Sequence, residues 1–337
     1  MKNKKKYKIL LLIVGCVILF ALIYKVGLST IYHQLIALKW KVLLLFFPFS
    51  LVFILDTLGW KYSFKEEKIS FKDLFIIRLA GESVNSIIPS ANFAGEPVKA
   101  YFLKKHNISM LDGMASVIIS KTMMTITQII FVMIGVVFFL YKLNVSSTRL
   151  IGSIAIILLG IPVIMFIIFI QKHGLFAFLL KLLRMLRIRI RYIEEREVRL
   201  KELDENIYQF YVHNKKKTFY TFVCFFLGWL AGVIEAFLIL YLLNIPIDTV
   251  SAYVIESLAT VAKGITSFIP GSIGGQEGGI IAIFVSLKLG TGVALTFGIL
   301  KRFRELIFIG VGLFVLSKLE WTVAESTTNE NYSQSSN

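Results

Sequence analysis

Two acid–base couples with the same spacing are the residues of this chain best suited to chemistry. Lys121 follows Glu96 by 25 residues and Arg302 follows Glu277 by 25 residues, so the second couple repeats the first at an offset of 181. Each base lies midway along an apolar stretch, where an unpaired charge would cost about 2.5–3.5 kcal/mol. We therefore expect Glu96 to pair with Lys121 and Glu277 with Arg302. Such pairs either fix the structure or line a polar path that contacts a substrate, and the sequence leaves both roles open.

The sequence before each glutamate is repeated as well. A serine and two apolar residues precede both Pro89 and Pro270, and the glutamate follows each proline by seven residues. These matches predict an internal duplication, with repeat 1 at about 42–141 and repeat 2 at about 218–318. The residues expected at the turning point of each repeat are Pro89, Asn92, Gly95, Pro270, Gly271, Gly274 and Gly275.

A helix should restart after each turning point, near Ala94 and near Gly275. Helix N-termini carry free N–H groups and the positive end of the helix dipole, which attract phosphate or carboxylate. Glycine lets the backbone approach such a group closely. The sequence therefore predicts that the free N–H groups at these two tips hold an anion.

These motifs belong to a strongly apolar chain of 337 residues. It is 56% hydrophobic and 17% charged, with a mean hydropathy of +0.75, whereas soluble domains are about 45–50% apolar and about 25% charged. Apolar stretches of roughly 18 residues or more indicate membrane-spanning helices. We predict an all-α polytopic membrane protein with about six full spans, at 9–24, 42–60, 112–141, 150–171, 218–243 and 292–318.

Two further apolar stretches, 74–103 and 250–290, are interrupted by proline and glycine and carry polar residues. A helix interior does not tolerate such a run, and broken helices at membrane depth occur where protein or a water-filled cavity covers them. We predict one re-entrant helical hairpin in each stretch. With a cytoplasmic N-terminus, the first hairpin opens inward and the second outward, which makes an inverted-topology repeat.

The formal net charge of +16 comes mainly from basic residues beside the apolar segments. This distribution follows the positive-inside rule and argues against a nucleic-acid partner. It predicts a multi-pass protein of a bacterial-type cytoplasmic membrane with both termini in the cytoplasm and membrane lipids as partners. We expect one transmembrane domain over 1–323, an amphipathic cytoplasmic segment at 172–217 and a disordered tail at 324–337.

The apolar stretches contain more charged residues than a passive anchor needs, and such residues usually face a bundle interior or a water-filled cavity. Glu82 and Lys263 each lie seven residues before the motif proline, so they occupy equivalent positions with opposite charge. Asp56 and Glu235 lie 179 residues apart, close to the repeat offset. The intramembrane charged residues outside the two couples are Asp56, Arg78, Glu82, Glu235, Glu256, Lys263, Lys301, Arg304 and Glu305.

The motifs at 95–99 and 269–277 resemble those of a known family. Over nearly its whole length the chain is similar to the flippase-like transmembrane domain of the lysylphosphatidylglycerol synthase (multiple peptide resistance factor) family, in a stand-alone form without the synthase domain. The resemblance implies a role in moving a lipid headgroup across the bilayer. Where the family often shows Arg followed by Leu and Asp, this chain has Lys121 followed by Thr, Met, Met and Thr. The resemblance and the intramembrane charges together suggest that the headgroup contacts Glu96, Lys99, Lys121, Glu277, Lys301, Arg302 and Arg304.

The sequence is compatible with three functions. The first is a flippase or related transporter for an anionic or zwitterionic lipid, such as an aminoacylated or polyprenyl-phosphate-linked lipid. The second is a membrane-embedded lipid-modifying transferase of the phosphatidylglycerol lysyltransferase or glycosyltransferase type. The predicted outer loops are short with Asp248 as their only acid, and no nucleophile–base arrangement or metal-ligand cluster is evident, so we expect no catalytic residue, metal or cofactor. The third is a non-catalytic partner of a lipid-modifying enzyme.

Overall fold

A computed structural model describes residues 38–335 of the chain, apart from residues 67, 89, 91, 144–145, 187–195, 270–271 and 273. All regular elements in this part of the chain are helices, as the composition predicts. The short 3₁₀ helices are η1 (Lys39–Leu45) and η2 (Lys104–His106). The α-helices are α3 (Phe46–Tyr62), α4 (Phe71–Ile87), α5 (Gly95–Leu103), α6 (Met110–Lys142), α7 (Ser146–His173), α8 (Leu175–Met185), α10 (Glu197–His213), α11 (Lys215–Leu242), α12 (Thr249–Ile265), α13 (Gly275–Ser286) and α14 (Thr291–Ser335).

Four of the described helical stretches are long and apolar enough to cross a membrane. They are Lys39–Tyr62, Met110–Lys142, Ile151–His173 and Lys215–Leu242. These stretches match four of the six predicted spans, so the chain is a polytopic membrane protein. The predicted span at 9–24 lies outside the described residues. The span predicted at 292–318 is helical within α14, but it is not among the four, and four charged residues lie near its centre.

The long helices form a bundle in which α3 and α11 pack along each other through the middle of the molecule. α6 packs beside α7, and α14 runs the full height of the molecule on the other side. Small residues bring these helices close together, as is usual in membrane proteins. A Cβ added at Gly312 of α14 would lie 1.7 Å from Ser83 Oγ on α4.

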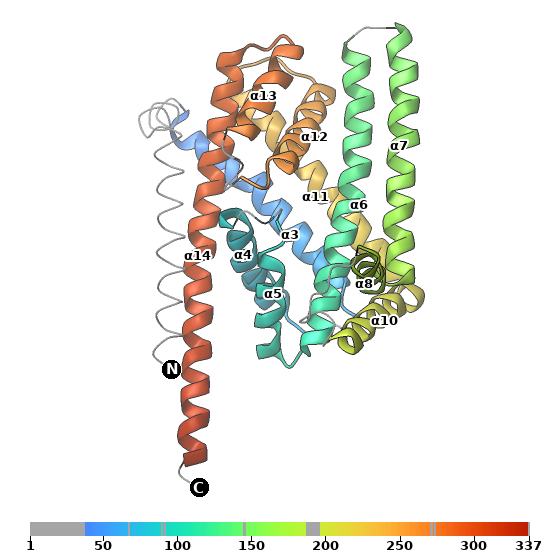
Figure 1. The fold of residues 1–337 in the computed structure, drawn as a ribbon. Coiled ribbons are helices and arrows are strands. Elements are labelled where there is room, and N and C mark those ends of the chain that lie inside the picture. The colour runs from blue at the N-terminus through green and yellow to red at the C-terminus, as the bar shows by residue number, and fades with distance from the viewer. Residues whose placement is uncertain are drawn as a thin grey trace.

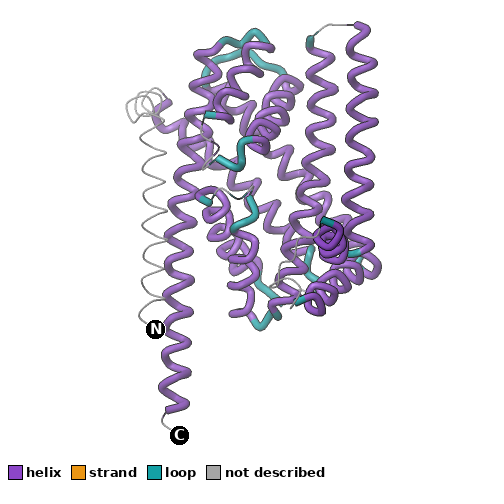
Figure 2. The backbone as a smooth tube through the Cα atoms, in the orientation of Figure 1, coloured by secondary structure: helices purple, strands orange, loops and turns teal. Residues whose placement is uncertain are grey.

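Two helical hairpins lie in opposite halves of the molecule. The first hairpin consists of α4 and α5, and the second consists of α12 and α13. Figure 2 shows their connecting loops near the middle of the molecule, one below the other. α14 packs against α4 and α13, while α6 packs against α5 and α12, so these two long helices hold both hairpins in place.

Local sequence signals explain where the hairpin arms begin and end. Ser70 caps α4 by accepting the N–H of Asp73 at 3.1 Å. Ile88 has an extended backbone, as expected for a residue that precedes proline, and α4 ends there. α5 begins at Gly95 and α13 at Gly275, next to the helix starts expected near Ala94 and Gly275.

The basic segment 172–217 includes two short helices, α8 and α10, at the end of the bundle opposite the second hairpin. Asp204 of α10 accepts the N–H groups of Phe176 and Ala177 at 3.0 and 2.8 Å, and so caps α8. Glu197 of α10 accepts a hydrogen bond from Arg184 of α8 at 2.6 Å. Hydrogen bonds from Lys201 and Arg184 lower the pKa of Glu197.

The last helix, α14, is assigned as far as Ser335. The disorder expected for residues 324–337 stays a prediction. Residues 313–335 contain no proline or glycine that would stop a helix. Adding residues to an existing helix costs far less free energy than nucleating a new helix. The polar end of α14 can therefore continue the helix that its apolar part begins.

Candidate functional site

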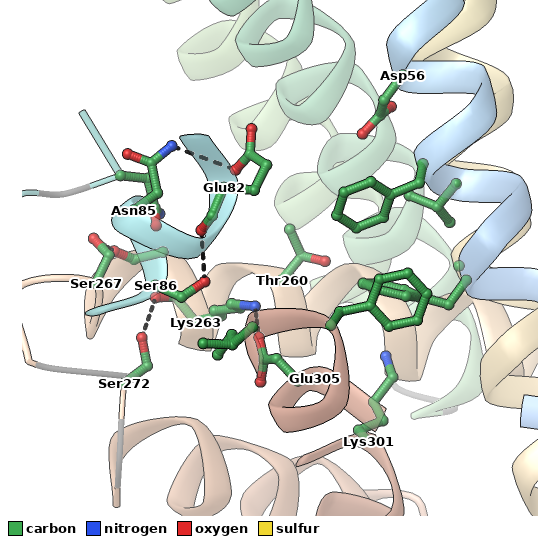
Figure 3. Close-up of a pocket in the computed structure, with 18 of the residues that line it drawn as sticks. Asp56, Glu82, Asn85, Ser86, Thr260, Lys263, Ser267, Ser272, Lys301 and Glu305 are labelled. Carbon is green, nitrogen blue, oxygen red and sulfur yellow. Dashed lines mark hydrogen bonds and ion pairs between the residues drawn. The ribbon is translucent and has the colours of Figure 1, made fainter. Parts of the chain in front are cut away.

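A cavity of about 310 Å³ lies between the two hairpins and is walled by α3, α6, α11 and α14. Figure 3 shows Glu82, Asn85 and Ser86 of the first hairpin opposite Lys263, Ser267 and Ser272 of the second. Aromatic and aliphatic side chains, including Phe49, Phe53 and Leu306, line part of the wall. Its charged lining consists of Asp56, Arg78, Glu82, Lys121, Glu235, Glu256, Lys263, Lys301, Arg302, Arg304 and Glu305. The cavity lining therefore combines charged side chains with aromatic and aliphatic ones.

Asn85 organises the tip of the first hairpin. Its Oδ1 accepts the N–H of Gly95 at 2.6 Å, and its Nδ2 donates to Glu82 at 3.3 Å and to Glu96 at 3.2 Å. The two arms touch at this point, because a Cβ added at Gly95 would lie 2.0 Å from the carbonyl oxygen of Gly81. Only glycine at position 95 allows such an approach.

Lys99 holds two acids of the first hairpin in place. Its Nζ donates to Glu82 Oε1 at 2.6 Å and to Glu96 Oε2 at 3.1 Å, and its side chain is buried. The expected pair of Glu96 and Lys121 is present at 3.5 Å, and Lys121 also donates to the carbonyl of Asn92 at 3.0 Å. Glu96 and Lys99 do not line the cavity, so they position Glu82 and Lys121, which do.

The second expected pair is present beside the second hairpin. Arg302 Nη2 donates to Glu277 Oε1 at 2.5 Å, and Arg302 Nη1 donates to Glu305 at 3.1 Å. Glu277 also accepts the N–H of Gly274 at 2.7 Å, which caps α13. Lys263 donates to Glu305 from the facing α12. As in the first hairpin, the motif glutamate lies behind the cavity wall and its basic partner forms part of that wall.

A third group of charges joins α11, α12 and α14. Lys301 donates to Glu256 and lies 3.7 Å from Glu235. Arg304 Nε lies 2.9 Å from Glu235 Oε1, but the orientation of its N–H leaves both atoms without a hydrogen bond. The Arg304 guanidinium rests on the ring of Phe49, 3.5 Å from its centre.

A fourth pair connects α3 with the first hairpin. Arg78 Nη2 donates to Asp56 at 2.8 Å, and both side chains are buried. Gly228 of α11 leaves room for this pair, since a Cβ there would lie 2.6 Å from Asp56 Oδ1. The carboxylates of Asp56 and Glu235, related by nearly one repeat offset, thus each lie beside an arginine that lines the cavity.

The prediction that free N–H groups at the hairpin tips hold an anion is wrong for the N–H groups of Ala94, Gly95 and Gly274. Ser90 Oγ accepts that of Ala94 at 2.9 Å, while Asn85 and Glu277 accept those of Gly95 and Gly274. The sequence does not show that polar side chains of the hairpins satisfy these groups. Of the predicted tip residues, Pro89, Pro270 and Gly271 lie outside the described part of the chain.

Glu82 and Lys263, which the sequence indicates as repeat equivalents, both line the cavity, and each binds its own partner, Lys99 and Glu305. The sequence analysis missed Asn85, Gln276, Phe49 and Phe53, which the fold also brings to the cavity. Asn85 and Gln276 were visible as polar residues next to the motif prolines and glutamates. Phe49 and Phe53 carry no signal that distinguishes them from lipid-facing aromatics, so only the structure identifies them.

The family model described as lysylphosphatidylglycerol synthase TM region matches residues 8–312. The chain belongs to this family. The paired motifs, the two hairpins and the cavity lie within the matched residues, so the site is built from the family region itself.

Three curated proteins that are similar to this chain are named as UPF0104 membrane proteins. One from Methanothermobacter thermautotrophicus is 26% identical over 292 residues, covering 82% of this chain and 84% of the relative. Another from Pyrococcus horikoshii is 25% identical over 320 residues, covering 88% and 92%. A third from Methanocaldococcus jannaschii is 24% identical, covering 90% and 91%. No solved structure matches the chain.

Proposed function

We propose that this protein moves a charged lipid headgroup across the cytoplasmic membrane through the central cavity. The observation that carries the proposal is the cavity itself, where eleven charged side chains line a space between two hairpins in a membrane protein. Charges inside a membrane protein are costly and usually mark the path of a substrate or an ion. The membership in the lysylphosphatidylglycerol synthase TM family supports a lipid as the substrate.

The arrangement of the hairpins supports alternating access. Their tips approach each other from opposite halves of the molecule, and the cavity lies where they meet. We interpret the two hairpins as re-entrant elements of an inverted-topology repeat, a design in which movement of one repeat against the other opens a central site to each side in turn. The ion pairs that join the hairpins to α6 and α14 would then be the contacts that rearrange.

Reconstitution into proteoliposomes tests this function directly. The substrates are acyl-labelled fluorescent phosphatidylglycerol, phosphatidylethanolamine, lysylphosphatidylglycerol and a polyprenyl phosphate, assayed with and without an imposed pH gradient and membrane potential. We expect the purified chain to speed the transfer of at least one of these lipids between leaflets. Glu277→Gln and Arg302→Gln should each slow that transfer about tenfold or more, because they release the second hairpin from α14.

The matched control is the exposed ion pair of Lys142 and Asp248, which joins α6 to the start of α12. Lys142 Nζ lies 2.9 Å from Asp248 Oδ1, and neither residue lines the cavity. Lys142→Gln should leave the transfer rate unchanged. If no lipid class crosses faster than in empty vesicles under any gradient, the proposed function is wrong. Equal rates in the wild type and in the Glu277→Gln and Arg302→Gln variants would exclude this ion pair from the mechanism.

A further inference from the structure

One face of α3 presents two aromatic rings to the cavity. Phe49, Phe53 and Asp56 follow one another at positions i, i+4 and i+7, so they lie on the same side of the helix. The rings of Phe49 and Phe53 are 5.2 Å apart between centres, and all three residues line the cavity. We refer to Phe49 and Phe53 as the aromatic face of α3.

Each of these rings lies against a buried arginine. The guanidinium carbon of Arg78, from α4, lies 5.9 Å from the centre of the Phe53 ring. That of Arg304, from α14, lies 3.5 Å from the centre of the Phe49 ring. Arginine commonly stacks on aromatic faces because its guanidinium is planar and weakly hydrated, and the contact leaves the N–H edge available.

Both arginines retain N–H groups without a hydrogen-bond partner. Arg78 is 4% exposed and Arg304 is 6% exposed. Nε of Arg78 and both Nε and Nη1 of Arg304 are buried and donate to no acceptor. Unsatisfied buried donors are rare in native proteins and often indicate a missing ligand or water. Here they belong to two residues that line one cavity.

A purely structural arginine would be expected to direct its donors to neighbouring acids. The acids next to Arg304 are already engaged, because Glu256 binds Lys301 while Glu305 binds Lys263 and Arg302. Glu235 Oε1 lies 2.9 Å from Arg304 Nε as an ion pair, although the N–H does not point at it. The Nη1 of Arg304 has no acceptor among the described side chains.

We propose that Arg78 and Arg304 form a two-position site for the phosphate of a lipid headgroup, which passes from one arginine to the other along the aromatic face of α3. The guanidinium edge matches phosphate oxygens geometrically, and charge-assisted bonds of this kind are strong. Phe49 and Phe53 are one helical turn apart, about 6 Å along α3, so the two positions lie beside neighbouring turns of one helix. Arg78 belongs to the first hairpin and Arg304 to α14, the helix that packs against both hairpins. This inference rests on the proposed function and specifies the group that the cavity recognises.

Calorimetric binding to the purified full chain in detergent tests the site. The probes are dihexanoyl phosphatidylglycerol, dihexanoylglycerol, which has no phosphate, and inorganic phosphate. We expect the phosphatidylglycerol probe to bind and dihexanoylglycerol not to bind. Arg304→Gln should weaken phosphatidylglycerol binding at least tenfold, whereas Arg184→Gln, a control at an exposed arginine of α8, should leave it unchanged.

Removing one arginine could unfold the protein by leaving a buried carboxylate unpaired. The double variants Asp56→Asn/Arg78→Gln and Glu235→Gln/Arg304→Gln avoid this, because they neutralise both members of each pair. Each should keep the thermal unfolding and gel-filtration profile of the wild type and still lose at least tenfold in affinity. Undiminished binding in both double variants would overturn the proposal. Inorganic phosphate that binds as tightly as the lipid and displaces it would assign the site to a free anion and overturn its assignment to a lipid.

Lipid transfer with the same variants separates this inference from the proposed function. If the wild type binds the lipid through the arginines but transfers none, the site stands and the transport function fails. If the wild type transfers lipid and both double variants do so at the same rate, the function stands and the two-arginine site fails.

Discussion

At the level of single residues, the acids and bases around the cavity are shared between several partners. Lys99 forms ion pairs with both Glu82 and Glu96, and Arg302 forms ion pairs with both Glu277 and Glu305. A base with two acids can release one of them without becoming unpaired. Such sharing lowers the cost of rearranging a buried ion pair, which is otherwise high.

Removal of a shared base should have a large effect on stability. Lys99→Met leaves Glu82 without its closest partner and weakens the hold on Glu96, so we expect the free energy of unfolding to fall by about 3–5 kcal/mol. Reversible unfolding in mixed detergent micelles measures this. Lys142→Met, in the exposed pair, should cost about 0–1 kcal/mol. The double variant Glu82→Gln/Lys99→Met should recover part of the loss, and a single variant as stable as the wild type would show that Lys99 does not hold the hairpin.

The sequence identified some of these contacts and not others, for a simple physical reason. Glu277 and Arg302 lie on consecutive helices and their spacing is repeated in Glu96 and Lys121, so the pairs could be predicted from the chain alone. Glu235 and Arg304 are brought together by helices far apart in sequence. No local pattern predicts such a contact, because it depends on which faces of α11 and α14 meet.

At the level of elements, α14 contacts both hairpins and so contributes to their positions. It packs against α4 over a surface where Gly312 allows the two backbones to approach closely. The breaks and restarts of the hairpins follow from proline, glycine and capping residues and were predictable. The packing of α14 on α4 was not predictable, because it depends on the fit of two surfaces, and a glycine in an apolar helix does not by itself indicate which neighbour it meets.

Gly312→Ala tests the contact between α14 and α4. The added Cβ would lie 1.7 Å from Ser83 Oγ and 2.6 Å from the carbonyl oxygen of Leu79. We expect a loss of about 1–3 kcal/mol in the free energy of unfolding, typical of overpacking. Gly310→Ala, two residues away on α14, is the control, because its Cβ would meet nothing within 4 Å. It should be neutral or stabilising by up to about 1 kcal/mol, since alanine favours a helix. Equal stability in both variants would mean that α14 and α4 can move apart at Gly312 without loss of free energy, and the prediction would be wrong.

For the whole molecule, the positions of the helix ends predict which side of the membrane each faces. The connections that follow α3 and η2 lie at the end of the bundle that carries α8 and α10, whereas the C-terminal end of α6 and the connection between α13 and α14 lie at the opposite end. The positive-inside rule places the first end in the cytoplasm. Cysteines introduced at Lys68 and at Lys288, in a chain with its own two cysteines replaced, should react differently with a membrane-impermeant maleimide. We expect labelling of intact cells only at position 288, and the reverse pattern would invert the proposed orientation.

The balance of charge around the cavity has an electrical consequence. Among the described residues, the acids of the cavity wall and of the pairs behind it are Asp56, Glu82, Glu96, Glu235, Glu256, Glu277 and Glu305. The bases are Arg78, Lys99, Lys121, Lys263, Lys301, Arg302 and Arg304, equal in number to the acids. A fully ionised site with this composition is neutral, so the net charge that crosses is that of the lipid and of any ion that moves with it. Moving one such charge through a membrane potential of 100 mV involves about 2.3 kcal/mol of work. Transfer of a phosphatidylglycerol-type anion would therefore respond to voltage, whereas transfer of a zwitterion would be electrically silent.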